Sequence, residues 1–130
     1  MMMRMRSRQW SRQHYLQHHQ AGAHNWVISP DIKKDLLKLS LAVLDSVLKL
    51  RETMMVLNYG SQKTLERAKD VEIAERIVDD QYRALTIKVL SGKLDVPVLM
   101  LLRDVLQLLE NSDDKAEDAA DAARMLSFIM

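Results

Sequence analysis

The chain has 130 residues, a formal net charge of +1 and no cysteine, and 48% of its residues are hydrophobic although only 5% are aromatic. This length corresponds to about one domain, and the lack of cysteine excludes thiolate metal sites and a cysteine nucleophile. With mostly aliphatic apolar residues, 3 glycines and 2 prolines, the composition favours a helical bundle over an all-β domain.

Residues 1–28 form a basic arm that contains four arginines, all four histidines and no acid, so residues 29–130 carry −3 of the total charge of +1. We expect an unstructured or partly helical arm followed by one domain over 29–130. The arginines are too widely spread to predict nucleic-acid binding, and His14 and His18 lack a nearby acidic partner for a metal site. No apolar run approaches the ~20 residues that span a bilayer. This predicts a soluble, cytoplasmic protein without a transmembrane segment.

The first helix is expected from Pro30 to Asn58. Ser29 can cap it, Pro30 suits its first turn, and Gly60 suits a left-handed C-cap. Its apolar residues form two stripes, a wider face than one partner helix needs. One stripe is Ile32, Leu36, Leu39, Val43, Leu50, Met54 and Leu57, and the other is Leu37, Leu41, Leu44, Leu48 and Met55.

The second helix is expected from Ser61 to Leu90, with Gly92 at its end. Glu75 occupies a position in its seam that ought to be apolar, and Asp79 follows one turn later. Carboxylates are rarely buried unless they are paired or bind metal. The alternative to a metal is an ion pair at the edge of the seam with Arg76, Arg83 or Lys115.

The third helix is expected from Val96 to Phe128, with Asp95 as its cap and Pro97 in its first turn. Its first half should pack through large residues and its second half through small ones, namely Val98, Leu102, Val105, Leu106 and Leu109, then Ala116, Ala119, Ala120, Ala122 and Ala123. Three helices of about 30 residues, each ~45 Å long and joined by short turns, predict an all-α antiparallel three-helix bundle.

An acidic stripe follows the third helix. Glu110, Asp114, Glu117 and Asp121 succeed one another at steps of four, three and four, and Asp118 lies one turn after Asp114. Like charges at this spacing are neighbours on a helix and repel one another. Such a stripe is therefore stabilised by a cation, either side chains from another helix or a metal ion.

Antiparallel pairing brings the two acidic segments together. If the turn is centred near residues 93–94, Glu75 lies level with position 112 and Asp79 with position 108, so both are at the height of Glu110 and Asp114. Carboxylates without cysteine or histidine make a hard oxygen site for Mg²⁺, Ca²⁺ or Mn²⁺, or for iron when carboxylates bridge several ions. The alternative is a solvated or salt-bridged acidic face.

These segments resemble known motifs. The stretch from Glu110 to Asp121 resembles the repeated E/D-x-x-x-D helix motif of PhoU-like proteins, and the stretch from Glu75 to Tyr82 resembles its partner on the preceding helix. Residues 90–95 are similar to the turn in the branch associated with Pit-type phosphate transporters. The resemblance covers about residues 30–128.

The resemblance implies a regulatory or accessory role in phosphate transport, through contact with a transporter or a sensor kinase rather than catalysis. It also implies binding of iron or another metal by Glu75, Asp79, Glu110 and Asp114, with Glu117, Asp118 and Asp121 along the same stripe. PhoU-like proteins have two three-helix repeats, and this chain has room for one. We expect either a truncated relative or a homodimer or higher homo-oligomer, which the wide apolar face of the first helix favours.

Two other classes of function stay open. One is a metal-dependent, all-α enzyme of the nucleotide pyrophosphohydrolase type, which uses clustered acids and Mg²⁺. Only a single Glu72-x-x-Glu75 pair supports it, without a nucleophile, a histidine base in the bundle or a glycine-rich phosphate loop. The other is a metal-free helical interaction module that binds a partner helix.

Overall fold

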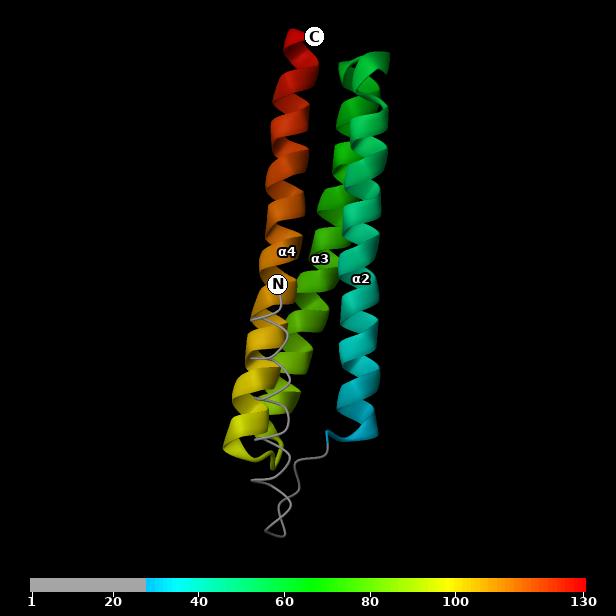
Figure 1. The fold of residues 1–130 in the computed structure, drawn as a ribbon. Helices are drawn as coiled ribbons and strands as arrows, with labels where there is room; N and C mark the ends of the chain where they lie inside the picture. Colours follow the sequence, from blue (N-terminus) through cyan, green and yellow to red (C-terminus); the bar gives the residue numbers. More distant parts are fainter. Residues whose placement is uncertain (1–27) are drawn as a thin grey trace, which may run out of the picture.

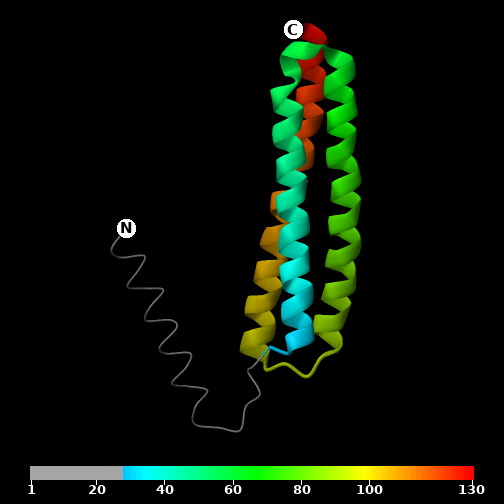
Figure 2. The same ribbon diagram turned by 90° about the vertical axis from the view of Figure 1, so that its right-hand side faces the viewer.

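Three long helices lie side by side in a computed structural model, which describes residues 28–130 (Figure 1). They are α2 (Pro30–Met55), α3 (Ser61–Ser91) and α4 (Val96–Ile129), and the short 3₁₀ helix η1 (Leu57–Tyr59) precedes α3. Each helix contacts the other two, and sequential helices run antiparallel (Figure 2). The predicted all-α antiparallel three-helix bundle is confirmed for this part of the chain. The predicted arm lies outside it, except for Ile28, which packs against the core.

The helix ends follow their local sequence closely. The Ser29 side chain accepts a hydrogen bond from the Ile32 amide at 3.2 Å, as the cap prediction requires. The first helix ends at Met55 and not at the predicted Asn58, because the chain tightens into η1 before it reverses. Gly60 directly precedes α3 with φ +108° and ψ 161°. This conformation is not the predicted left-handed cap, although it also favours glycine.

The two apolar stripes of α2 have different environments. The first faces the bundle, where Ile32, Leu39 and Val43 are buried. Every residue of the second stripe is exposed, by 44–62% of its surface, namely Leu37, Leu41, Leu44, Leu48 and Met55. The three-helix bundle therefore uses only one of the two stripes.

The seam of α4 differs from the prediction at three positions. Val105 and Ala122 are exposed, whereas Asp113 is fully buried. The seam advances by steps of three and four through Leu106, Leu109, Asp113, Ala116 and Ala120, so Val105 and Ala122 fall beside it. No helix within residues 28–130 has an apolar stretch long enough to cross a bilayer.

The buried core is divided by a polar layer at mid-height. A larger apolar cluster that includes Leu39, Leu85 and Leu106 lies on one side of this layer. A smaller cluster of Ala68, Val71 and Ala120 lies on the other side. Between them each helix contributes a buried polar residue, and these are Ser46, Glu75 and Asp113. The sequence thus interrupts its own core at one level of the bundle.

Candidate metal centre

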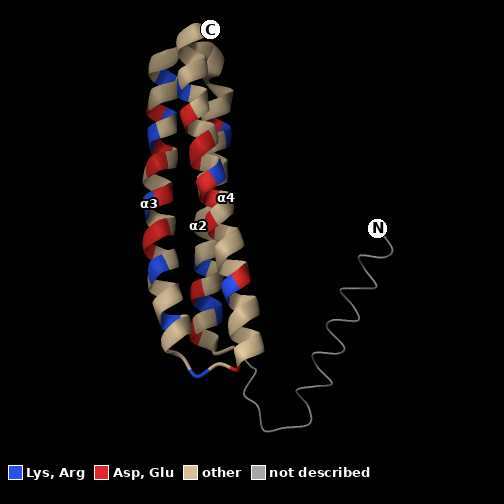
Figure 3. Ribbon diagram, turned by 90° about the vertical axis from the view of Figure 1, so that its left-hand side faces the viewer, with Lys and Arg blue, Asp and Glu red and all other residues tan. Residues whose placement is uncertain are grey.

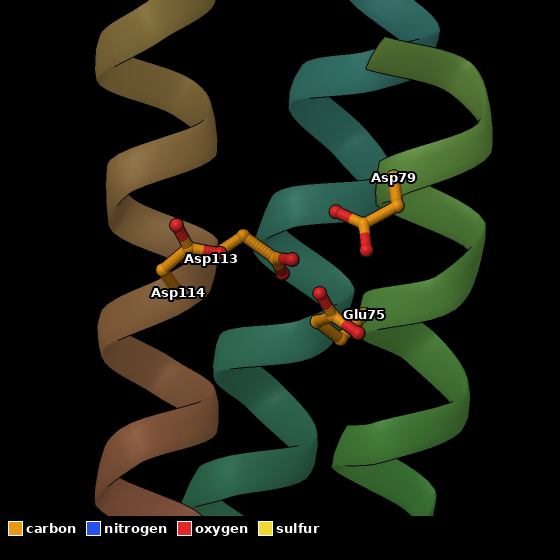
Figure 4. Close-up of side chains that lie close together, drawn as sticks. All are labelled: Glu75, Asp79, Asp113 and Asp114. Carbon is orange, nitrogen blue, oxygen red and sulfur yellow. The ribbon is translucent and has the colours of Figure 1, made fainter. Parts of the chain in front are cut away.

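Four carboxylates meet between α3 and α4 at the level of the polar layer. Glu75 and Asp79 come from α3, and Asp113 and Asp114 come from α4 (Figure 4). One carboxylate oxygen from each of the four lies within 4.8 Å of the other three. Acidic residues gather over the middle of both helices (Figure 3). We call Glu75, Asp79, Asp113 and Asp114 the carboxylate cluster.

Helical spacing places the two innermost carboxylates in the core. Glu75 lies one turn after Val71 and three residues before Val78, and both valines are fully buried. Asp113 lies three residues before Ala116, which is also buried. Residues three and four apart share a helix face, so each acid continues a buried seam and points toward the other helix.

Asp113 is buried without a conventional partner. It has no exposed surface, and neither of its carboxylate oxygens accepts a well-formed hydrogen bond within residues 28–130. The Ser46 hydroxyl of α2 acts to lower the pKa of Asp113, but the two side chains lack the geometry of a hydrogen bond. Buried polar groups are normally paired, so Asp113 is an exception that needs an explanation.

The expected ion pairs with Glu75 do not form within the described residues. Arg76 instead pairs with Glu72 at 2.9 Å, and Arg83 lies 3.8 Å from Asp80. No lysine or arginine in residues 28–130 lies within ion-pair distance of the four carboxylates. Their negative charge is therefore not compensated by side chains of that part of the chain.

Burial and mutual repulsion hold protons on this cluster. Burial raises the pKa of Glu75 to about 8, helped by a hydrogen bond with Asp79 and by the negative charges around it. Burial likewise raises the pKa of Asp113 to about 6, and the charges of Asp79 and Asp114 add to the rise. Without a cation, the cluster is therefore partly protonated at neutral pH.

Of the seven acids predicted from the sequence, the structure brings Glu75, Asp79 and Asp114 together. Glu117 borders them within hydrogen-bonding reach of Glu75, and burial raises the pKa of Glu117. Glu110 does not join the cluster and lies beside Tyr82, where burial and then the Glu110 carboxylate raise the pKa of the Tyr82 hydroxyl.

The two remaining predicted acids, Asp118 and Asp121, also lie outside the cluster. Asp118 is exposed, and Asp121 lies 3.6 Å from Arg124. The acidic residues of the stripe therefore follow one another at helical spacing along α4, but their side chains have different neighbours.

The ligand set predicted from the sequence does not include Asp113, the most buried ligand candidate. The predicted stripe passes from Glu110 to Glu117 through Asp114, although Asp113 also lies three residues after Glu110 and four before Glu117. The core seam would have found it, because Leu106, Leu109, Asp113 and Ala116 follow one another at helical spacing. An acid at a seam position is the pattern that identified Glu75.

The carboxylate cluster suits a hard divalent cation. Its ligand atoms are all oxygens, which Mg²⁺, Ca²⁺ and Mn²⁺ prefer and which also bind iron. Opposite oxygens around one cation lie about 4 to 5 Å apart at the usual bond lengths, so a spread within 4.8 Å requires little rearrangement. The unpartnered oxygens of Asp113 are the atoms that gain most from such an ion.

Comparisons of the chain with protein-family models, curated proteins and solved structures gave no match. The PhoU-like resemblance therefore depends on the acidic motifs and on the turn at residues 90–95. The geometry of the carboxylate cluster does not depend on this resemblance.

Proposed function

We propose that this chain is a PhoU-like cytoplasmic regulator of phosphate transport that binds a divalent cation between α3 and α4. In this proposal Glu75, Asp79, Asp113 and Asp114 hold the ion, and Glu117 completes the site from its edge. The ion neutralises the repulsion between the two helices and sets their separation. The protein then acts through contact with a transporter or a sensor kinase and not through catalysis.

One observation carries the metal part of this proposal. Asp113 is completely buried, its two oxygens lack hydrogen bonds within residues 28–130, and it lies among three other carboxylates. An unpaired buried charge is costly, and a cation bound beside Asp113 would compensate that cost. The regulatory part is supported by the two acidic motifs, which meet at this one site.

The alternative enzymatic role has little support in the geometry. Glu72, the first acid of the E-x-x-E pair, lies 2.9 Å from Arg76 and 3.4 Å from Arg124. It is therefore engaged in ion pairs and is not one of the four clustered carboxylates. The cluster also has no histidine among residues 28–130 that could serve as a base.

Cation binding is tested by titration calorimetry of the chelator-treated protein with Mn²⁺, Ca²⁺ and Mg²⁺. We expect E75Q/D113N to weaken binding at least about tenfold, because it removes two of the four ligands and metal affinity is sensitive even to outer-sphere changes. The matched control is E110Q/D118N, which makes the same chemical changes outside the cluster and should bind like the wild type. Absence of binding in the wild type would make the chain a metal-free helical module, and equal loss in both variants would show that the carboxylate cluster does not hold the cation.

The regulatory role needs a separate experiment. Deletion of the gene should alter phosphate uptake by the source cells, and the wild-type gene should restore it. E75Q/D113N should restore uptake less well than E110Q/D118N if the cation matters for regulation. Unchanged uptake after deletion would reject the role in phosphate transport and leave the cation site standing.

A further inference from the structure

The second apolar stripe of α2 is an exposed seam. Leu37, Leu41, Leu44 and Leu48 follow one another at steps of four, three and four, and each exposes between 44% and 61% of its surface. Arg51 and Met55 continue the spacing, and Val47 is exposed beside it. Four successive leucines at this spacing are the pattern by which one helix packs along another in a coiled coil.

We infer that a second copy of this chain covers this seam, with the two α2 helices antiparallel about a twofold axis. The seam faces away from the core residues of α2, so neither α3 nor α4 covers it. An antiparallel pair centred between residues 42 and 43 places Leu41 level with Leu44 of the other copy. It also places Leu37 level with Leu48 of the other copy, so all four leucines of each copy are paired.

Near the centre of the seam, charged side chains complement one another in this arrangement, whereas Lys34 lies level with Arg51 of the other copy toward its ends. Lys38 and Asp45 flank the same edge of the leucine stripe on opposite sides of the centre. The twofold axis therefore brings Lys38 of each copy beside Asp45 of the other and forms two equivalent ion pairs. Neither residue forms an ion pair within residues 28–130 of its own chain. Both side chains are exposed at the surface of the single chain.

A parallel arrangement of the two α2 helices would instead bring like charges together. In a parallel coiled coil, a residue at one edge of the seam meets the residue five positions later on the other helix. Lys33 of each copy would then meet Lys38 of the other, and two like-charged pairs would form. Charge patterns of this kind select partner orientation, so the sequence of α2 favours the antiparallel dimer.

The first test is the molar mass of the 130-residue chain by sedimentation and light scattering at micromolar concentrations. We expect twice the single-chain mass of 15.0 kDa for the wild type. L41E/L44E should have the single-chain mass with unchanged helical circular dichroism, because both side chains are already exposed. The control L101E/L108E makes the same change at exposed leucines of α4 and should remain dimeric.

The second test is a charge exchange that probes the register. K38E and D45K should each weaken the dimer by about tenfold, since each places like charges opposite one another. An equimolar mixture of the two variants should form a heterodimer of wild-type affinity, because every pair is then again of opposite charge. Each single variant should melt at the temperature expected for the undimerised three-helix bundle.

Three results would overturn the inference. They are a wild-type chain that stays at the single-chain mass, a dimer that L101E/L108E disrupts and L41E/L44E does not, and a mixture of K38E and D45K that fails to pair. The dimer does not depend on the carboxylate cluster. E75Q/D113N should therefore keep the wild-type mass even where it has lost cation binding, so failure of one proposal is distinguishable from failure of the other.

Discussion

Asp113 and Glu75 occupy positions in the helix seams where their neighbours are valine, leucine and alanine. Glu75 is 9% exposed and Asp113 is not exposed at all. Both carboxyl groups therefore ionise at higher pH in the folded chain than in the unfolded one. The same burial that makes them unfavourable as free charges makes them strong ligands, because a bound cation meets little competition from water.

These pKa shifts predict how stability depends on pH. A carboxyl group with a raised folded pKa contributes stability that is present below its unfolded pKa and is lost as the pH rises through the folded value. The metal-free protein should therefore lose stability between about pH 4 and pH 8, first through Asp113, whose pKa is about 6, and then through Glu75, whose pKa is about 8. Thermal melts in chelator across this range measure the effect.

The variant E75Q identifies the group responsible. It should flatten the upper part of this pH dependence and raise the free energy of unfolding near pH 8 by about 1–3 kcal/mol, the usual cost of an unsatisfied buried group. D118N, which changes an exposed acid, should keep the wild-type slope. A melting temperature that is constant or increases from pH 5 to pH 8 would contradict the assignment of protons to the carboxylate cluster.

At the scale of elements, the reversal between α2 and α3 depends on one backbone conformation. Gly60 has φ +108° and ψ 161°, a region that is essentially restricted to glycine. A β-carbon at this position would meet no atom within 4 Å, so any cost of a side chain comes from the backbone and not from crowding. The Thr64 hydroxyl donates to the Gly60 carbonyl at 3.0 Å and secures the start of α3.

Gly60→Ala should therefore destabilise the bundle by about 1–3 kcal/mol. The matched control is Gly92→Ala at the other turn, where φ is −80° and the added carbon would lie 3.4 Å and 3.5 Å from backbone oxygens, an ordinary contact. We expect that variant to stay within about 0.5 kcal/mol of the wild type. Urea unfolding followed by circular dichroism measures both, and equal losses would show that the conformation of Gly60 is not limiting.

At the scale of the whole molecule, the polar layer lowers the stability of the metal-free bundle and supplies the carboxylates of the candidate cation site. It separates the larger apolar cluster from the smaller one, so the core is not continuous along the bundle. Proteins commonly depart from ideal core packing at functional sites. A cation that binds only the folded chain would recover stability, by an amount that rises with the logarithm of its concentration relative to its dissociation constant.

The variant Asp113→Leu should be more stable without metal and should lose cation binding. An apolar side chain would join the two clusters and raise the unfolding free energy in chelator by about 1–4 kcal/mol, as replacement of buried charges by apolar groups often does. The same variant should lose the increase in melting temperature that Mn²⁺ gives the wild type. Asp118→Leu is the control and should retain that increase. A destabilised Asp113→Leu would indicate that the polar layer is needed for folding itself.

The sequence by itself determined the helices, the Ser29 cap, the positions of the turns and the antiparallel order of the helices. These depend on local spacing, on Ser29, Gly60 and Gly92, and on short connections, all of which operate over a few residues. Sequence register also predicted that Glu75, Asp79 and Asp114 would meet. It erred at the end of α2, where Met55 and not Asn58 is the last helical residue.

Only the tertiary structure decided which acids converge. Two neighbouring acids on α4, Asp113 and Asp114, both reach the cluster, whereas Glu110 turns to Tyr82 and Asp121 to Arg124. It also decided which stripe of α2 is buried and which is left exposed. The physical reason is that side-chain direction and burial depend on the rotation of each helix about its axis, and this rotation is set by packing against residues far away in the sequence.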